Sequence, residues 1–295
     1  MRQYLDALCR AVTEGTRQYI DRNRTWCYAI PPVVFTHDCS DGYIPLLTTK
    51  RVAYRVAFAE ALAYWRGYSN LSDFHDLGTR TWDENAKAEG WVKSPFYKGD
   101  GDLGRIYGVQ GRRWRKYGEL LGRNGKVCAE YLGPVDQLRK VYDNLRRGID
   151  DRGEIITYWN VGELDRGCLR PCMFQHQFTL LDNTLHLTSY QRSGDLPLGV
   201  PFNMAQTGWL LHVMARITGS NPGTITHIIA NPHVYEDQIP AAKKQLMRFP
   251  RDQRPKLNIP NNINTLQDMD SWVRPTDFVV DGYDPASPLN YPFSA

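Results

Sequence analysis

Three short segments of this chain carry residue types that could perform chemistry together. Residues 170–173 read Arg-Pro-Cys-Met and open a run with β-strand alternation, residues 191–195 read Gln-Arg-Ser-Gly-Asp, and residues 199–203 read Gly-Val-Pro-Phe-Asn. They supply a thiol nucleophile, a cation that could bind phosphate and activate the thiol, a carboxylate, and an amide that could read a planar heterocycle. This order predicts a site for covalent chemistry in this part of the chain.

Cys172 and Arg192 stand out from the other residues of their types. A lone cysteine is most often a small hydrophobic residue in a core, and we assign that role to Cys9, Cys27, Cys39, Cys128 and Cys168. Cys172 differs because it follows a proline beside Arg170, and a nearby cation makes a thiolate a good nucleophile. Arg112, Arg113 and Arg115 are interpreted as solvated surface pairs. Arg192, flanked by apolar residues, would need an anion if buried, and phosphate accepts its planar fork.

Two predicted elements position these groups. Residues 54–65 form an apolar helix that ends at Gly67 and carries one conspicuous carboxylate, Glu60, which we expect to be poorly solvated. Alternating residues at 174–180 and 185–189, with Asp-Asn between them, predict an antiparallel hairpin. Cys172 therefore lies at the entrance of a strand.

The rest of the chain reads as helices, strands and one long loop region. The pattern predicts an opening helix that ends before residues 22–24, a helix from Pro134 to Gly148, a strand at 154–159, a helix at 204–217, a strand at 224–230 and a helix from Tyr235. Residues 86–130 are rich in Gly, Lys and Arg and predict loops. We find no internal repeat and no linker, so we expect one domain over residues 1–295.

Composition excludes several classes of protein. The 295 residues are 42% hydrophobic, which suffices for one sizeable core, and 36 basic against 32 acidic residues give no electrostatic footprint for nucleic acid. The six cysteines form no CxxC pair, so we expect no zinc or other metal site and no disulfide scaffold. The chain lacks a long apolar run and a signal peptide, so we expect a soluble cytoplasmic protein without a membrane partner.

Taken together, the motifs resemble the thymidylate synthase family, including its pyrimidine nucleotide hydroxymethylase branch. The match runs through most of the chain, at residues 48–51, Glu60, 81–84, 101–108, 159–164, 171–172, 191–193, 201–203 and 233–235. The resemblance implies an α+β fold with a large mixed or antiparallel sheet packed with helices and dimerising through the sheet. Residues 86–130 would be an insertion-bearing loop region of that single catalytic domain.

The resemblance also implies a reaction. Cys172 would add to C6 of a uracil or cytosine nucleotide, so that C5 attacks the one-carbon group of 5,10-methylenetetrahydrofolate. Asn203 and Glu60 match the positions that stabilise the oxyanion at O4, and Glu60 and Tyr107 match those that hold the water network for proton transfer. Tyr107 could otherwise be a packed aromatic, but its Gly-rich setting favours the functional interpretation.

Substrate contacts follow from the same resemblance. Arg22, Arg152 and Arg192 match phosphate ligands, with Arg152 donated by the other subunit of a homodimer, and Gln191 and Ser193 lie beside them. His233 and Tyr235 match residues that bond the sugar 3′-hydroxyl, although a histidine at a strand end is ordinarily structural. Asn203 can donate to uracil O4 and accept from N3–H, whereas cytosine-specific members carry an aspartate there. dUMP is therefore favoured over dCMP.

The folate site departs from the family pattern. Residues that match folate contacts are Lys50, Trp82, Asn85, Leu169, Asp195, Gly199 and Phe202. The histidine expected after the nucleophile is Met173, a histidine is replaced by Ala53, a tryptophan by Asn85, and an aliphatic residue by Thr81. These changes predict a wetter pocket in which Asn85 could anchor a water.

Water access decides the product, so we favour dUMP hydroxymethylation over the alternative, reductive methylation to dTMP by a thymidylate synthase. An alternative of another class is a non-catalytic nucleotide- or RNA-binding module that uses the basic segment 112–126. It is disfavoured because the candidate catalytic residues Cys172, Glu60, Tyr107, Arg192 and Asn203 are all present.

Overall fold

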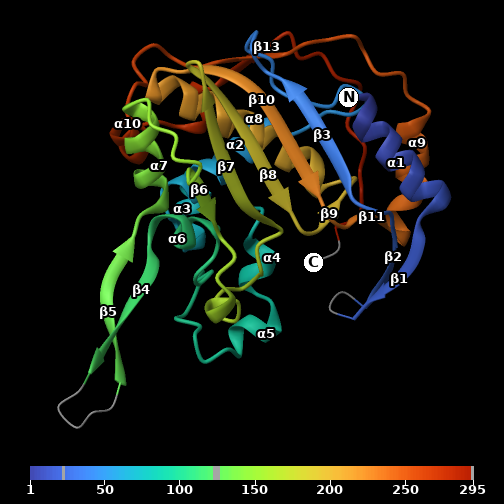
Figure 1. Ribbon diagram of the computed structural model, residues 1–295. Helices are drawn as coiled ribbons and strands as arrows, with labels where there is room; N and C mark the ends of the chain where they lie inside the picture. The colour runs from blue at the N-terminus through green and yellow to red at the C-terminus, as the bar shows by residue number, and fades with distance from the viewer. Residues whose placement is uncertain (22–23, 122–126, 294–295) are drawn as a thin grey trace.

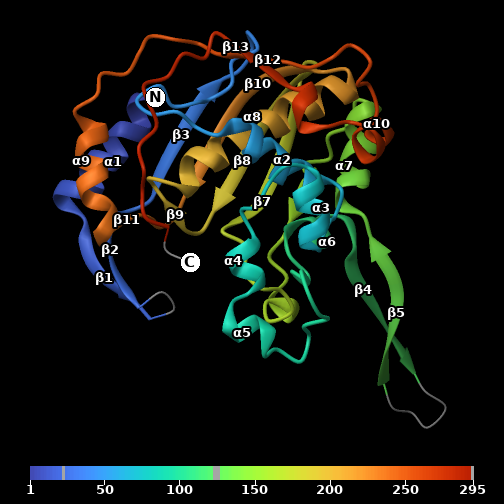
Figure 2. The same ribbon diagram turned by 180° about the vertical axis from the view of Figure 1, so that it is seen from behind.

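The computed structural model describes residues 1–21, 24–121 and 127–293. Its central sheet has five strands in the order β3, β10, β8, β7, β6, and only the β10–β8 pair is parallel. The strands are β3 (Val33–Asp38), β10 (Asn221–Ile229), β8 (Thr184–Gln191), β7 (Met173–Leu181) and β6 (Ile155–Thr157). Helices α8 (Gly199–Thr218) and α2 (Tyr54–Trp65) lie behind the sheet face seen in Figure 1 and in front of it in Figure 2. The predicted α+β architecture with a large mixed sheet is confirmed.

A four-stranded sheet forms the other end of the molecule. Its order is β1 (Thr16–Ile20), β2 (Thr25–Ala29), β11 (Pro232–Tyr235), β9 (Gly194–Asp195), and it packs against α1 (Arg2–Glu14). The β11–β9 pairing is parallel and places His233 opposite Asp195. Two segments that the sequence analysis identified separately therefore meet at one sheet edge.

The remaining elements surround these two sheets. The helices are α3 (Leu71–Asp76), α4 (Asp83–Ala86), α5 (Glu89–Val92), α6 (Tyr107–Arg112), α7 (Gln137–Arg146), α9 (Ile239–Leu246) and α10 (Leu266–Ser271). Single turns are η1 (Val161–Glu163), η2 (Glu236–Gln238) and η3 (Pro275–Asp277). The pairs β12 (Lys256–Asn258) with β13 (Val279–Asp281) and β4 (Trp114–Leu121) with β5 (Val127–Val135) are antiparallel ribbons.

Helices α2 and α8 are apolar on most sides because the core surrounds them. The ring of Trp209 on α8 packs edge-on against Trp65 of α2, with centroids 5.8 Å apart, and lies 6.4 Å from Phe58. Burying side chains of this size contributes on the order of 2–3 kcal/mol each. This packing fixes the two helices relative to each other, and with them the carboxylate of α2 and the amide of α8 that the sequence analysis singled out.

Several predicted elements are confirmed with shifted ends. The helix at 54–65 and the hairpin around residues 182–183 form as predicted, and Asp182 and Asn183 have positive φ at the turn. The opening helix ends at Glu14, and β1 follows where the sequence shows no alternation because its residues are mostly exposed. Of the cysteines expected in the core, Cys9 and Cys128 are exposed.

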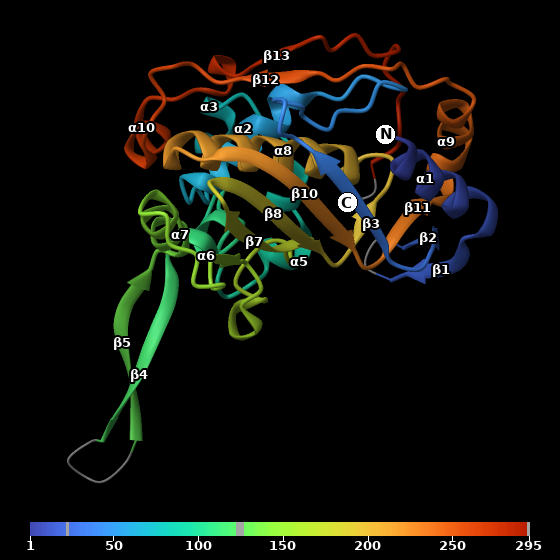
Figure 3. The ribbon, with the colours of Figure 1, turned by 45° about the horizontal axis from the view of Figure 1, so that its top comes forward.

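The loop prediction for residues 86–130 was wrong for much of that region. It contains α6 and the β4–β5 ribbon, which projects from the body in all three views (Figures 1–3). Its strands face solvent on both sides, because successive residues of β5 are nearly all exposed, so no apolar alternation marks them in the sequence. Pro134 lies in β5, and α7 begins at Gln137 because the Asp136 carboxylate caps the backbone N–H of Arg139.

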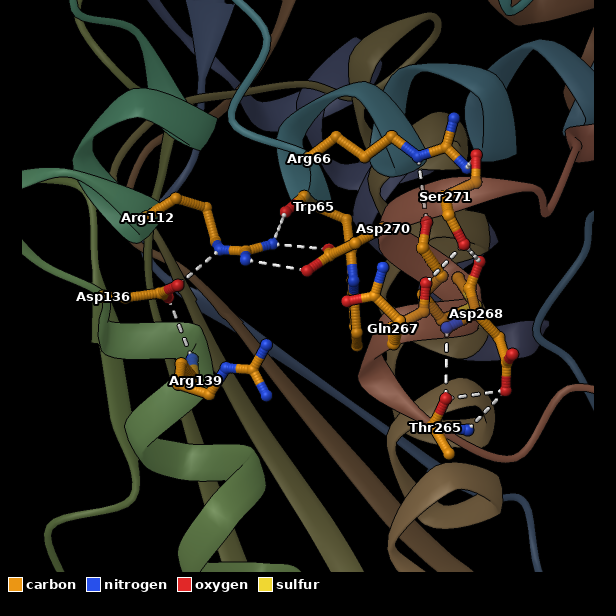
Figure 4. A network of polar contacts seen from close by, with 11 residues as sticks. Trp65, Arg66, Arg112, Asp136, Arg139, Thr265, Gln267, Asp268, Asp270 and Ser271 are labelled. Carbon is orange, nitrogen blue, oxygen red and sulfur yellow. Dashed lines mark hydrogen bonds and ion pairs between the residues drawn. The ribbon is translucent and has the colours of Figure 1, made fainter.

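Arg112 is not the solvated surface residue that the sequence suggested. Its guanidinium donates to both carboxylate oxygens of Asp270, at 2.7 and 2.9 Å, to Asp136 at 3.0 Å and to the Trp65 carbonyl at 2.7 Å (Figure 4). Only 14% of the Arg112 side chain is exposed. This one residue therefore ties α6 to the end of α2, the cap of α7 and α10.

Replacing Arg112 with methionine should destabilise the fold by about 3 kcal/mol, because it leaves two partly buried carboxylates without their cation. Urea unfolding measures the difference. The matched control is Lys93→Met, which removes a well-exposed ion pair with Glu89 and should change the free energy of unfolding by less than about 1 kcal/mol. Equal effects of the two substitutions would contradict this role of Arg112.

Candidate active site

A cavity of about 560 Å³ lies where α2, α8, β8, β9 and β11 meet. Most of the residues singled out in the sequence line it: Glu60, Trp82, Asn85, Tyr107, Leu169, Cys172, Gln191, Ser193, Asp195, Gly199, Phe202, Asn203, His233 and Tyr235. They come from segments as far apart as positions 60 and 235. The fold therefore brings the candidate nucleophile, carboxylates and amide to one place.

Four predicted site residues are not among those that line the cavity. Arg22 lies outside the described residues. Arg152 is exposed on the turn before β6, with φ of 67°. Arg192 lies beside the cavity, and buried Lys50 donates to the carbonyl of Pro197 instead.

Lys50 is buried next to the segment that carries Asp195, since its ammonium group contacts the Pro197 carbonyl. Its ammonium group sits 4.5 Å from the ring centroid of Tyr291, and burial lowers its pKa to about 8 although the Asp195 charge acts in the opposite direction. Lys50 thus contacts Tyr291 of the C-terminal segment and is not among the residues that line the cavity.

Cys172 is held by its backbone immediately before β7. Its N–H donates to the Tyr107 hydroxyl at 2.7 Å, and its carbonyl accepts from the N–H of Arg192 at 2.9 Å. The Arg192 guanidinium donates to the carbonyls of Pro171 and Arg170 and lies 4.0 Å from the Cys172 sulfur. A cation at that distance favours the thiolate, the nucleophilic form of cysteine.

Glu60 is a carboxylate with direct protein donors on both oxygens. The Thr81 hydroxyl donates to Oε1 at 2.5 Å, and the Gln206 amide donates to Oε2 at 2.6 Å. Burial raises the pKa of Glu60, while hydrogen bonds from Thr81, Gln206, Tyr64 and Trp82 act against that increase. The result is an oriented carboxylate that can gain or lose a proton within the cavity.

An aromatic wall stands between Glu60 and Cys172. The Tyr107 ring stacks on Tyr64 with centroids 4.6 Å apart, and the Trp82 indole N–H donates to the Tyr64 hydroxyl at 2.9 Å. Burial raises the pKa of Tyr107 well above its ordinary value, and the nearby Cys172 contributes to this increase. Tyr107 is therefore a neutral hydroxyl that can relay protons and support the Cys172 backbone.

Asn203 lies between two glutamine amides. Its Oδ1 accepts from Gln191 at 2.9 Å, and its Nδ2 donates to Gln206 at 3.1 Å. The Gln191 carbonyl contacts Nε2 of the fully buried His227 at 2.7 Å. Each end of the Asn203 amide keeps one further hydrogen-bonding position for a ligand.

Asp195 also lines the cavity and has a fixed carboxylate. Its carboxylate accepts from the backbone N–H of Leu198 at 3.1 Å and from the Gln238 amide at 3.0 Å, and burial raises its pKa. The same Gln238 amide donates to the carbonyl of Pro292 at 3.1 Å, and Phe293 lines the cavity. The C-terminal segment is thereby held against the site.

Three residues of the site, Gln206, Tyr64 and Gln238, were not predicted from the sequence. Gln206 follows Asn203 by three positions on the predicted helix, so it had to share a face with that candidate. Within residues 1–21, 24–121 and 127–293, no cluster of three or more His, Cys, Asp or Glu side chains has the arrangement of a metal site. None of the helices in this part of the chain is long and apolar enough to cross a membrane.

Comparison with known proteins gives a consistent result. The model of the family described as "Thymidylate synthase" matches residues 2–295. The chain is 48% identical to a thymidylate synthase of Mannheimia succiniciproducens over 298 residues and 46% identical to one of Vibrio parahaemolyticus over 296 residues. A thymidylate synthase of Haemophilus influenzae is 47% identical over 296 residues. Each alignment covers 100% of this chain and of the relative.

Thr81→Val tests the support of Glu60 through the pH dependence of stability. The pKa of Glu60 is raised on folding, so its ionisation opposes folding as pH rises above about 4.3, the unfolded value, and the full penalty is present above the folded pKa. Loss of the hydroxyl donor should therefore cost about 1 kcal/mol at pH 4, where Glu60 is protonated, and about 2 kcal/mol at a pH above its folded pKa, where the acceptor is charged.

Urea unfolding at both pH values measures this difference. Thr218→Val is the matched control, because its buried hydroxyl donates to the Met214 carbonyl and contacts no titrating group. Its effect should be the same at both pH values. A pH-independent effect of Thr81→Val would contradict the assignment.

Proposed function

The chain belongs to the thymidylate synthase family, and from that premise we propose that it transfers a one-carbon unit to C5 of dUMP, with reductive methylation to dTMP as the reaction. The observation that carries the proposal is the convergence of Cys172, Tyr107, Glu60 and Asn203 on one cavity. The names of relatives with 46–48% identity over the whole chain favour methylation.

Cys172 begins the reaction by adding its sulfur to C6 of the pyrimidine. Arg192, 4.0 Å away, favours the thiolate, and the Tyr107 hydroxyl holds the backbone N–H of Cys172. Addition at C6 moves negative charge toward O4 and makes C5 nucleophilic. The Asn203 amide retains an N–H that can donate to O4 as this charge develops.

Glu60 and Tyr107 handle the protons. The C5 proton must leave, and Glu60 is a carboxylate whose pKa burial raises toward the range useful for general acid–base catalysis. Tyr107 stays protonated at neutral pH because burial raises its pKa. Together they can hold a short water path between the cavity and C5.

Binding of the nucleotide uses groups at both ends of the cavity. Ser193 and Arg192 lie together at the end of β8 and suit the phosphate. The Arg192 guanidinium has five N–H donors. Those that bond the Pro171 and Arg170 carbonyls hold the guanidinium in place, and the others can donate to the phosphate. Buried His233, whose ring packs edge-on against Tyr235 with centroids 5.2 Å apart, suits the sugar hydroxyl.

The cavity also suits a folate. Trp82, Leu169 and Phe202 offer apolar surface to a planar ring, and Asp195 offers a fixed carboxylate to ring N–H groups. Methylenetetrahydrofolate supplies the one-carbon unit and, for methylation, the hydride. Asn85 and Gly199 also line the cavity, whereas Lys50 contacts Tyr291 of the C-terminal segment.

Hydroxymethylation of dUMP is the second candidate, and Asn85 is the observation that favours it, because its amide lines the cavity. The other differences from the family pattern support hydroxymethylation less than the sequence suggested. The Thr81 hydroxyl is engaged by Glu60, and Met173 is apolar and only 5% exposed, so neither adds a water site. These contacts, with the names of the relatives, move our proposal from the hydroxymethylase to the methylase.

Product analysis with dUMP and methylenetetrahydrofolate separates the two reactions. We expect dTMP and dihydrofolate in equal amounts, because the apolar side chains of Trp82, Leu169 and Phe202 shield the one-carbon group from bulk water and leave the folate hydride as its reaction partner. 5-Hydroxymethyl-dUMP with tetrahydrofolate would establish the second candidate instead.

Cys172→Ser should lower the turnover rate by at least about 10³-fold, because it removes the nucleophilic thiol. Cys168→Ser is the control and should retain activity, because Cys168 is half-buried and does not line the cavity.

We further propose a homodimer formed through the central sheet. On the face opposite α8, Thr226 pairs with Thr36 and Thr188, and Ile228 pairs with Val34 and Tyr190. Val34 is 54% exposed. A flat face of β-branched and aromatic side chains is suited to pack against a second copy. Arg152, exposed outside its own cavity, would then reach the phosphate of the neighbouring site.

Mixing two inactive variants tests this arrangement. If Arg152 acts across the interface, subunits of Arg152→Glu and Cys172→Ser should together regain roughly a quarter of wild-type activity, because mixed dimers form with one intact site each. A mixture that stays inactive after subunit exchange would show that Arg152 does not serve the neighbouring site. Arg147→Glu changes an exposed arginine five positions earlier in the chain; it is the matched control and should be active alone.

A further inference from the structure

A directed chain of side-chain hydrogen bonds crosses the site from β10 to α2. It starts at Nε2 of buried His227, passes through the amides of Gln191, Asn203 and Gln206, and ends on Oε2 of Glu60, with donor–acceptor distances of 2.7, 2.9, 3.1 and 2.6 Å. Gln206 is the link between the base-reading amide and the carboxylate.

The chemistry of the ends fixes the direction of the chain. Glu60, when ionised, only accepts, and the carbonyl of Ala57, 3.3 Å from Gln206 Nε2, only accepts as well. The Gln206 NH₂ group must therefore face α2, and its carbonyl oxygen must face Asn203. Asn203 has to present its own NH₂ group to that oxygen.

The other neighbour of Asn203 imposes the same orientation. Gln191 Nε2 donates to the Ser193 carbonyl at 2.8 Å, so its NH₂ group faces Asn203 Oδ1. Burial lowers the pKa of His227 to about 3, which keeps the ring neutral with Nε2–H donating to the Gln191 carbonyl. Both amide ends of Asn203 are thus assigned by partners that cannot reverse without losing hydrogen bonds.

We propose that Gln206 is a positioning residue that locks the Asn203 amide in the orientation that reads uracil and couples that orientation to the Glu60 carboxylate. This inference rests on the proposed function of the site. Asn203 in this orientation offers a lone pair to the uracil N3–H and a hydrogen to O4. Cytosine presents an acceptor at N3 and a donor at N4 and requires the reverse.

Reversal of Asn203 for cytosine would be opposed on both sides. Its oxygen would face the Gln206 oxygen, and its NH₂ group would face the Gln191 NH₂ group. If Gln206 turned as well, its carbonyl would face the Glu60 carboxylate and the Ala57 carbonyl. Selection against cytosine thus comes from residues that need not touch the base.

Nucleotide binding without folate tests the proposal. Calorimetry gives the Kd of dUMP and dCMP for the wild type and for Gln206→Met, which keeps the length of the side chain and removes its hydrogen bonds to Asn203, Glu60 and the Ala57 carbonyl. The ratio of the dCMP Kd to the dUMP Kd should fall roughly tenfold, the value of about one well-placed hydrogen bond. Gln206→Ala, favourable in a helix, should give the same result if the methionine variant folds poorly.

Gln206→Glu distinguishes orientation from packing. The introduced carboxyl group and Glu60 can share one proton between them. In either arrangement of that proton, the other oxygen of the introduced group faces Asn203 and accepts from its NH₂ group. The preference for dUMP should therefore be retained. Gln137→Met removes a glutamine that bonds the Gln110 and Thr157 carbonyls away from the cavity, and should leave the ratio unchanged.

The outcomes separate this inference from the proposed function. An equal increase in the Kd of both nucleotides in Gln206→Met and Gln206→Ala would mean that Gln206 only holds α8 against α2. That result would overturn the proposal while leaving the proposed function intact. A wild type that binds neither nucleotide would overturn the proposed function and this inference with it.

Discussion

The site depends on keeping one carboxylate, that of Glu60, inside the protein with its charge satisfied. An unpaired buried charge is strongly unfavourable, and the hydrogen-bonding partners of Glu60 in the described chain are neutral groups. Donors from Thr81, Gln206 and the aromatic wall supply the stabilisation. Because these donors come from α2, α8 and the segment before α4, the carboxylate can be satisfied only when those elements are correctly packed.

That requirement explains why the site is supported from a distance. The edge-on packing of Trp209 against Trp65 fixes α8 on α2, and Arg112 anchors the end of α2 to α6, α7 and α10. The central sheet places Cys172 and Gln191 at the same end, since β7 begins where its partner β8 finishes. Catalytic geometry is therefore a property of the whole core rather than of one loop.

The sequence pointed to the candidate reactive groups but not to the residues that support them. Cys172, Glu60 and Asn203 were predicted because a reactive or charged side chain in an apolar or strand-edge setting is conspicuous. Gln206 and His227 were not, because an amide inside a helix and a histidine inside a strand look like ordinary packing residues. Arg112 was misassigned because its partner Asp270 is far away in the sequence, and the β4–β5 ribbon because its exposed strands carry no apolar alternation. Lys50 was assigned by motif alone, and its burial under Tyr291 follows from tertiary contacts.

The shared hydrogen-bond donor at Gln238 makes the two sides of the C-terminal segment interdependent. One NH₂ group satisfies both the Asp195 carboxylate and the Pro292 carbonyl. If a molecule bound at Asp195 favours the docking of the chain end, then by thermodynamic reciprocity release of the chain end must weaken the binding of that molecule to the same degree. Ligand binding at Asp195 and docking of the chain end would then be coupled through Gln238. Removing the last few residues would lower the affinity for that ligand, although those residues do not contact the Asp195 carboxylate.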